Sequence, residues 1–345
     1  MSKKIQTSSL RNSLFKDISV FLDSEGFVHS DIHTEGIMLL INLVSDYYEE
    51  GKHLYPEVII THDLDKLQLT VSRRVFIKEC KFDVESFREA LKLCAPLAID
   101  GWVIYIELKQ ENIRFGVFST EITETSLSLN RQTMYEDSFS DEATFAYIRC
   151  VGQKVVELRG KHGSVQVCLN LDEEKDLSNN EIESLSKIIS SRCDDESKDK
   201  LSVYFEKVID NSLKAGHGNL IGVVEDCPEK ITNIKSVLSD GIYLEEPIDM
   251  AALVSQAEYD KSSSNSFSLR AYASIMSAMI NHDGITLMTD TGKLLGYHLF
   301  VRSGSKDNEP VGGARCRAFE SMKSLELKAC FYKSQDGNMK LYEYK

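Results

Sequence analysis

One acidic, polar segment divides this 345-residue chain into two halves that are rich in apolar residues. Residues 171–200 read LDEEKDLSNNEIESLSKIISSRCDDESKDK, with charged and small polar side chains around a single short helical pattern. A run of charge like this is typical of a solvated connection. Because the chain is too long for one small domain, we expect a separately packed domain on either side of the segment.

The expected organisation has four parts and an α/β (α+β) fold class. Residues 1–30 are an N-terminal extension, 31–175 an α+β domain, 176–200 the acidic linker with its helix, and 201–345 a second domain. The second domain is expected to have a central mixed sheet flanked by helices. The sequence shows no internal repeat and no low-complexity tract.

Apolar periodicity predicts the elements of the N-terminal domain. A helix is expected over residues 35–50, and Asp83 is a suitable N-cap for a second helix that reaches Cys94. Alternating or continuous apolar runs predict seven strands, at residues 58–60, 67–71, 101–108, 113–118, 144–150, 154–158 and 164–169.

The C-terminal domain is predicted to mix helices and strands along the chain. Helices are expected at residues 201–216, 228–238, 248–256, 266–280 and 314–324. Strands are expected at residues 219–225, 285–289, 294–301, 329–333 and 339–344.

Composition excludes several classes of partner. With 40 Lys and Arg against 54 Asp and Glu, the net charge is −14, so the chain is a poor candidate for binding nucleic acid or an anionic membrane. The longest apolar stretch, residues 37–44, is too short to span a bilayer, and the first 13 residues lack the apolar core of a secretory signal. The eight cysteines form no CxxC pair, which favours reduced thiols in a cytoplasmic protein. A homo-oligomeric state is left open.

Two short motifs in the C-terminal domain can carry chemistry. His282-Asp283-Gly284 joins a predicted helix to a predicted strand, where an exposed Asp and a flexible Gly let a ligand approach the backbone. An ordinary turn is the alternative interpretation.

The second motif is Gly312-Gly313-Ala314-Arg315-Cys316-Arg317, at the start of a predicted helix. Free backbone amides at a helix N-terminus attract anions, and two guanidinium groups suit phosphate oxygens. The alternative is a glycine turn with two solvated arginines. If both motifs form one site, Asp283, Gly284, Arg315 and Arg317 should converge, and both arginines can face one phosphate only where the helix is not yet regular.

The run from about residue 200 to the end resembles the diadenylate cyclase (DAC) domain family, the synthases of cyclic di-AMP. Five segments match the motifs of that family in order: GNLIGVVE at 218–225, SDGIYL at 239–244, HDGI at 282–285 for HDGA, GARCRAF at 313–319 for GTRHRAA, and SQDG at 334–337 for SEExG. The resemblance covers about 145 residues and also implies the family's fold for this domain.

The resemblance implies roles for the matched residues. Asp283 would bind a divalent metal and help to activate a ribose 3′-hydroxyl, and Gly284 would lie close to the nucleotide. Arg315 and Arg317 would hold the phosphates of ATP, with Mg²⁺ or Mn²⁺ between acid and triphosphate. The nucleotide-binding set also includes Gly312, Gly313 and Ser334.

The departures from the family pattern concern catalysis more than binding. Ile285 replaces a small Ala, Cys316 replaces the His of the RHR motif, and Gln335-Asp336 replaces paired glutamates. Only Asp336 can then stand in as a second metal ligand, whereas both arginines are retained.

We therefore expect a DAC-like sensor that binds a purine nucleotide or cyclic dinucleotide through its Asp-Gly and Arg-x-Arg motifs. The alternative is an active diadenylate cyclase, a nucleotidyltransferase that makes cyclic di-AMP from two ATP molecules in paired domains. A third hypothesis is a partner-binding protein whose DAC-like fold has lost its ligand.

Overall fold

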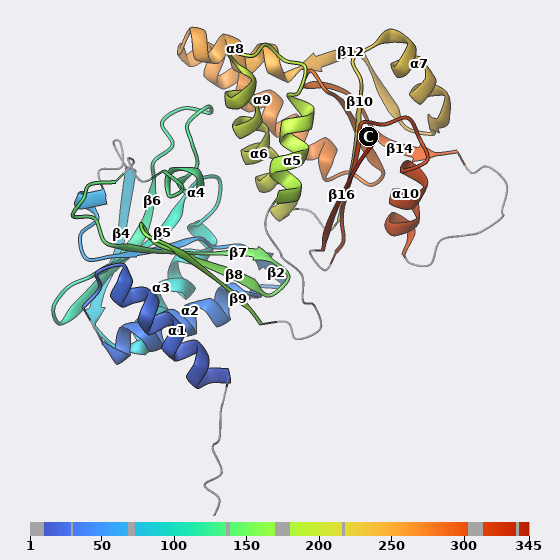
Figure 1. Ribbon diagram of the computed structural model, residues 1–345. Helices are drawn as coiled ribbons and strands as arrows, with labels where there is room; N and C mark the ends of the chain where they lie inside the picture. The colour runs from blue at the N-terminus through green and yellow to red at the C-terminus, as the bar shows by residue number, and fades with distance from the viewer. Residues whose placement is uncertain are drawn as a thin grey trace, which may run out of the picture. The chain divides into compact units, whose positions relative to one another are not determined.

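The chain folds into two compact units in a computed structural model (Figure 1). One unit comprises residues 1–122 and 127–176, and the other comprises residues 123–126 and 177–345. Each is built on its own mixed seven-stranded sheet flanked by helices, in agreement with the expected α/β class. No helix in the described part of the chain is long and apolar enough to cross a membrane. The structure describes residues 10–28, 30–67, 73–135, 139–169, 180–215, 218–302, 313–335 and 338–344.

The first unit starts with helices α1 (Leu10–Ser24) and α2 (Asp31–Val44) and a hairpin of β1 (Tyr47–Glu49) and β2 (Lys52–Leu54). Its sheet has the order β4-β6-β5-β3-β7-β8-β9, in which only β3 and β5 are parallel. The remaining elements are β3 (Val58–Thr61), a 3-10 turn (Asp65–Leu67), β4 (Arg73–Lys81), α3 (Val84–Cys94), a 3-10 turn (Ala95–Leu97), β5 (Val103–Leu108), β6 (Asn112–Ser119), α4 (Leu129–Gln132), β7 (Phe145–Gly152), β8 (Val155–Arg159) and β9 (Ser164–Cys168).

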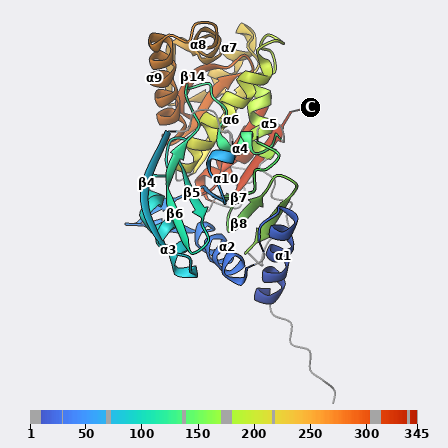
Figure 2. The ribbon, with the colours of Figure 1, turned by 90° about the vertical axis from the view of Figure 1, so that its left-hand side faces the viewer.

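Apolar residues cover both faces of this first sheet. Helices α1, α2 and α3 pack on one face, with α2 between the other two, and bury Phe21, Ile41 and Phe87 there (Figure 2). The segment that carries α4 covers the other face and brings Leu129 and Phe139 against the sheet. The first unit thus has a core on each side of its sheet.

The second unit also starts with two helices, α5 (Asn180–Ile189) and α6 (Lys198–Ala215). Its sheet has the order β11-β14-β13-β10-β15-β16, and β12 also pairs with β14. Its other elements are β10 (Asn219–Val224), α7 (Pro228–Val237), β11 (Leu238–Ser239), β12 (Ile242–Asp249), α8 (Met250–Tyr259), α9 (Ser263–Ile280), β13 (Ile285–Thr289), β14 (Lys293–Val301), α10 (Ala314–Met322), β15 (Ala329–Lys333) and β16 (Met339–Glu343).

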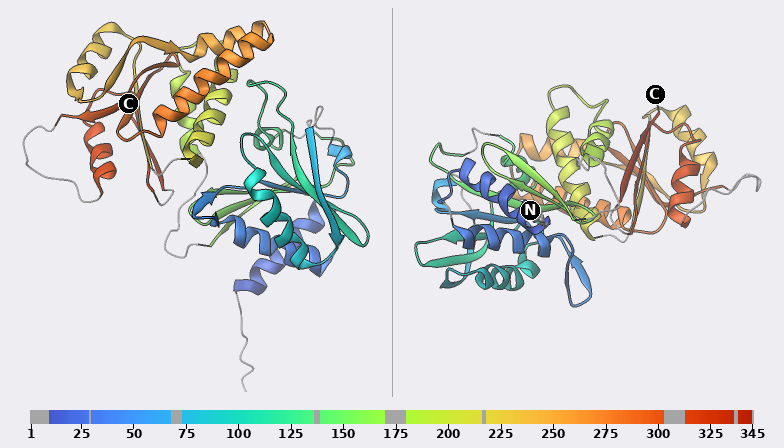
Figure 3. Two further views of the ribbon diagram at one scale, coloured as in Figure 1. Left: turned by 180° about the vertical axis from the view of Figure 1, so that it is seen from behind. Right: turned by 60° about the horizontal axis from the view of Figure 1, so that its bottom comes forward.

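Helices lie on both faces of the second sheet (Figures 1 and 3). Helices α5, α6, α8 and α9 build one core, in which Leu185 of α5 is buried together with Ile221 and Val223 of the sheet. Helices α7 and α10 build the other core around Ile234 and Phe319. The acidic segment expected as a linker therefore contributes α5 to a core from residue 180 onward.

Six of the seven strands in each sheet share one topology, and β9 and β11 have no counterpart in the other sheet. In chain order, the strands β3, β4, β5, β6, β7 and β8 correspond to β10, β12, β13, β14, β15 and β16. In each set the first and third strands pair in parallel, and all the remaining pairs are antiparallel. Two helices precede the first strand in both units. The fold is therefore repeated although the sequence shows no repeat.

Several sequence predictions are confirmed, and others are wrong. The Asp83 side chain caps α3 by accepting the Ser86 N–H at 2.8 Å, and β13 and β15 have the predicted bounds. The helix expected at 35–50 instead spans 31–44, because the chain turns into the β1–β2 hairpin. Of the strand expected at 67–71, Leu67 closes a 3-10 turn and the rest lies outside the described residues. The predictions also missed α1, β1, β2, β4, α4, β11 and β12.

Candidate functional site

The topology of the second sheet brings three of the motif segments to one edge. Strands β10 and β13 are parallel, with Leu220 beside Ile285, so both strands begin at this edge. Strand β15 runs in the opposite direction and ends there, with Lys333 beside Asn219. Gly218, the Asp-Gly turn and Ser334 therefore meet at the end of the sheet where β10 and β13 begin. We call this end of the strands the amino edge.

The turn between α9 and β13 is anchored by hydrogen bonds from both strands. The Asn219 side-chain amide donates to the Ile280 carbonyl at 2.8 Å, and the Thr286 hydroxyl donates to the Met279 carbonyl at 2.9 Å. The last carbonyls of a helix have no partner within the helix, so these bonds fix where α9 ends. As a result, His282, Asp283 and Gly284 form a short turn whose two ends are fixed.

Gly284 is required by the backbone of this turn. Its φ is +96°, and a Cβ at this position would lie 2.9 Å from the carbonyl carbon of His298 on β14. Any other residue would be strained and would also displace β14. Packing against β14 is thus sufficient reason for a glycine here, separately from any approach of a ligand.

Asp283 and Arg315 come together across the amino edge. Arg315 is the second residue of α10, and its Nη2 lies 3.4 Å from Oδ1 of Asp283. The Arg315 side chain also lies beside Gly218, where a Cβ would be 3.3 Å from Arg315 Cδ. The two side chains remain 39% and 66% exposed, so the pair is open to solvent.

Arg317 does not share this position. The helix is regular from Ala314, and the Arg317 N–H donates to the Gly313 carbonyl at 3.0 Å. Residues two apart on a regular helix differ by about 200° around its axis, so Arg315 and Arg317 leave α10 on opposite sides. The condition for both arginines to face one phosphate is not met.

The other predicted site residues have different outcomes. Ser334 lies at the amino edge and closes the turn between β15 and β16: its hydroxyl accepts the Asn338 N–H at 2.9 Å, and its N–H donates to the Asn338 carbonyl at 2.8 Å. Gly313 is the N-cap of α10. Gly312 and Asp336 lie outside the described residues.

The described residues suit a metal ion that is coordinated partly by the protein and partly by a bound nucleotide. They contain no group of three or more His, Cys, Asp or Glu side chains arranged to bind an ion. Mg²⁺ is commonly bound by one or two carboxylates together with the phosphates of a nucleotide. The exposed carboxylate of Asp283, beside Arg315, suits that mode of binding.

His298 is a residue of this edge that the sequence analysis missed. Its Nδ1 lies 2.7 Å from the carbonyl oxygen of Asp283, and Nδ1 of His282 lies 3.2 Å from the same oxygen. The only sequence signal was a polar ring within the apolar run Leu294–Val301. A polar residue in an apolar run does not predict a contact with the Asp283 turn, fifteen residues earlier in the chain.

The opposite edge of the same strands is closed by its own side chains. Oδ1 of the fully buried Asp290 accepts the Asp226 N–H at 2.8 Å, and Lys328 Nζ lies 2.7 Å from Oδ2 of Asp290. Asp226 accepts hydrogen bonds from Thr291 and Lys293, at 2.6 and 2.9 Å. Burial alone would raise the pKa of Asp226, but these two bonds and the nearby charges of Lys293 and Arg192 together outweigh burial and lower the pKa.

This difference between the edges bears on where a ligand binds. Ligands of open parallel sheets usually bind beyond the carboxyl ends of the strands. In this unit the charged groups at those ends are engaged with one another. At the amino edge, a guanidinium and a carboxylate are exposed beside the N-terminus of α10, a combination that can hold a phosphate and a cation.

Comparison with known proteins adds no family assignment. No protein-family model matches the chain, and no curated protein matches it either.

Proposed function

We propose that the second unit binds an adenine nucleotide, either ATP or a cyclic dinucleotide, as a DAC-like sensor module. The observation that carries the proposal is the meeting of Gly218, Asp283 and Arg315, from three separate segments, at one exposed sheet edge. These are segments that resemble DAC motifs, and their meeting supports a shared role in ligand binding.

The energetics of the Asp283–Arg315 pair favour exchange with a ligand. An ion pair this exposed contributes about 0–1 kcal/mol. A charge-assisted hydrogen bond from a guanidinium to a phosphate contributes about 1.5–3 kcal/mol. A phosphate can therefore replace the carboxylate on Arg315, which leaves Asp283 free to hold a cation that arrives with the nucleotide.

The same edge supports binding better than turnover. Arg317 leaves α10 on the side opposite Arg315, so a single arginine serves the edge. Cys316 stands where the DAC pattern has a His, and a thiol is a weak hydrogen-bond donor. Both features remove phosphate contacts of the kind that catalysis of phosphoryl transfer depends on.

Calorimetric titration of the full chain tests the binding proposal. ATP and cyclic di-AMP are titrated separately, once with EDTA and once with Mg²⁺. Saturable binding of at least one of them is expected. If neither binds under either condition, the hypothesis of a fold that has lost its ligand replaces this proposal.

An active cyclase is the second candidate, supported by the exposed Asp283 carboxylate beside a phosphate-binding arginine. The purified chain is incubated with ATP and Mn²⁺, and the products are analysed by mass spectrometry. A sensor forms no cyclic di-AMP above a control that contains EDTA. Turnover near 1 per second, a rate ordinary for enzymes, would establish the cyclase instead.

A further inference from the structure

We propose that His298 is a positioning residue that holds the Asp283 turn in the orientation needed for ligand binding. The inference rests on the proposed nucleotide function and adds a residue to it. His298 belongs to β14, outside the segments that resemble DAC motifs.

The backbone of His298 has a conformation that is unusual for its place in the fold. Its φ is +57°, although it lies within a strand. The other non-glycine residues with positive φ in the described part of the chain are at turns or bends: Glu50, Asp100, Lys154 and Asp240.

A bulge accounts for this conformation. Ile285 on β13 pairs with Leu299, whereas Leu287 pairs with Gly296, so β14 uses three steps where β13 uses two. The extra residue of a bulge is left out of the ladder and re-aims a side chain. Here the bulge turns the His298 ring toward the Asp283 turn, where its Nδ1 meets the Asp283 carbonyl.

The contacts of the ring explain how it acts on Asp283. A carbonyl oxygen only accepts hydrogen bonds, so the Nδ1 atoms of His298 and His282 that face it carry hydrogen. The two rings pack edge to face with centroids 4.6 Å apart, and Phe300 packs on His298 with centroids 4.8 Å apart. The peptide after Asp283 is thereby held while the carboxylate faces Arg315.

The choice of residue indicates a role for the side chain. A positive φ is unfavourable for histidine and easy for glycine or asparagine. Strain of this kind persists where the surroundings enforce it, and it concentrates at functional sites. A glycine at this position would lose the hydrogen bond to the Asp283 carbonyl together with the ring contacts to His282 and Phe300.

Three variants of the full chain separate this role from a purely structural one. His298→Gly removes both the strain and the ring. His298→Asn tolerates a positive φ and places an amide nitrogen the same number of bonds from Cα as Nδ1. Lys154→Gly is the matched control, because Lys154 also has φ +57° but lies in a turn of the first unit. ATP affinity and the thermal unfolding midpoint are measured for each.

His298→Gly is expected to unfold at the same or a higher temperature, and to bind ATP about three- to tenfold more weakly, as for one lost hydrogen bond. His298→Asn should recover most of the affinity. Lys154→Gly should keep the affinity of the original chain. Unchanged ATP affinity in His298→Gly overturns the proposal, as does a joint fall of affinity and midpoint that His298→Asn does not reverse.

Hydrogen exchange distinguishes this proposal from the proposed function. If the original chain does not bind ATP, the nucleotide function fails, and exchange of the ligand-free protein still tests the positioning. Faster exchange of the amides at 283–285 in His298→Gly than in the original chain supports the role of His298. Equal exchange overturns it.

Discussion

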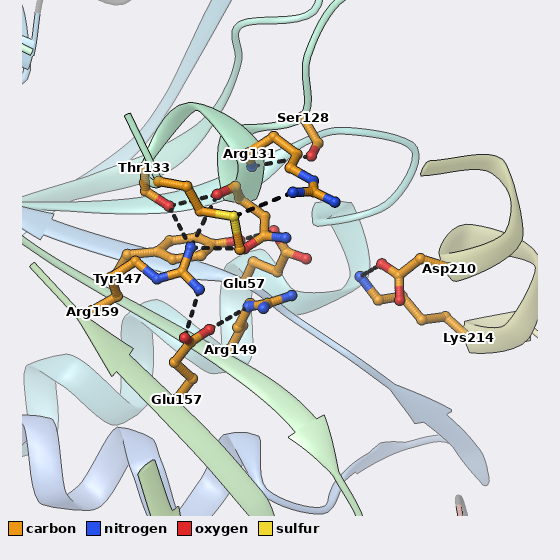
Figure 4. A network of polar contacts seen from close by, with 12 residues as sticks. Glu57, Ser128, Arg131, Thr133, Tyr147, Arg149, Glu157, Arg159, Asp210 and Lys214 are labelled. Carbon is orange, nitrogen blue, oxygen red and sulfur yellow. Dashed lines mark hydrogen bonds and ion pairs between the residues drawn. The ribbon is translucent and has the colours of Figure 1, made fainter. Parts of the chain in front are cut away.

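The two units repeat one strand order but use arginine–carboxylate pairs in opposite ways. In the first unit, Glu157 lies between Arg149 and Arg159, and the three side chains are only 7–11% exposed (Figure 4). In the second unit, Asp283 and Arg315 are 66% and 39% exposed. The same charges thus form a closed network in one unit and an open pair in the other.

The closed network is satisfied by protein groups. Glu157 accepts hydrogen bonds from Arg149 Nε at 2.7 Å and from Arg159 Nη2 at 2.5 Å. Arg159 Nη1 also donates to the Asn130 carbonyl and to the Thr133 hydroxyl, both at 3.2 Å. Charges engaged in this way hold β7, β8 and α4 together. The open pair leaves its charges accessible to a ligand.

The Asp-Gly turns of the two units also differ in how accessible they are to an anionic ligand. Asp100-Gly101 precedes β5 as Asp283-Gly284 precedes β13, and both glycines have positive φ. The Glu121 carboxylate lies over Gly101, where a Cβ would be 2.8 Å from its Cδ. A carboxylate in that place disfavours phosphate. The proposed phosphate site in the second unit therefore has no equivalent at the corresponding turn of the first unit.

The largest expected effect is on the closed network. Glu157→Gln removes the carboxylate that two buried guanidinium groups share, and breaking a buried ion pair in this way costs about 3–5 kcal/mol. Urea denaturation should show this loss, while the remaining folded protein keeps its ATP affinity. A loss below about 1 kcal/mol would mean that the network is not structural.

The next effect concerns the open pair. Arg315→Ala should weaken ATP binding by about 1.5–3 kcal/mol, or roughly ten- to 150-fold, and change the free energy of unfolding by less than about 0.5 kcal/mol. Arg270→Ala, at an exposed position on α9, removes the same charge elsewhere on the unit. Calorimetry that finds equal losses for both variants would contradict a specific role for Arg315.

A smaller effect is expected from acid. Burial would raise the pKa of Glu157, but Arg149 and Arg159 outweigh burial, and the pKa is lowered from 4.5. An acid with a lowered folded-state pKa stabilises the protein above its unfolded pKa, and this stability is lost as the pH falls through the folded value. The stability of the original chain should therefore fall below about pH 4 more steeply than that of Glu157→Gln. Parallel curves in denaturation at several pH values would refute this.

The smallest effect is expected for Asp283→Asn. Without metal, the variant should bind ATP as well as the original chain or up to about twofold better, because a carboxylate no longer repels the phosphates. Any gain in affinity from Mg²⁺ should disappear. ATP titrations of Asp283→Asn and of the original chain, in EDTA and in Mg²⁺, test this. If Mg²⁺ raises the ATP affinity of both proteins equally, the cation binds elsewhere.

Local patterns predicted much of the fold. Asp83 caps α3 through a contact three residues away, and the apolar runs of β13 and β15 are read directly from the sequence. Strand β12 has exposed residues along its length and therefore no apolar alternation. The stripe of Ile182, Leu185 and Ile189 on α5 is surrounded by acidic residues that make the segment resemble a linker.

Long-range relations were harder to predict. The shared topology depends on how the strands pair. Different sets of apolar residues are equally compatible with the same pairing, so the sequence shows no repeat. The motif interpretation joined Asp283 with Arg315, which the structure brings to 3.4 Å, but the regular start of α10 separates Arg317 from them. His298 reaches the site through a bulge, a feature that strand periodicity does not reveal.

Hydrogen exchange of the full chain with and without ATP tests most directly whether the second unit binds at its amino edge. We expect ATP to slow exchange at residues 218–220, 282–286 and 313–317, and to leave exchange at residues 145–159 of the first unit unchanged. Protection confined to residues 225–227 and 290–293, at the opposite edge, or to the first unit would contradict this expectation.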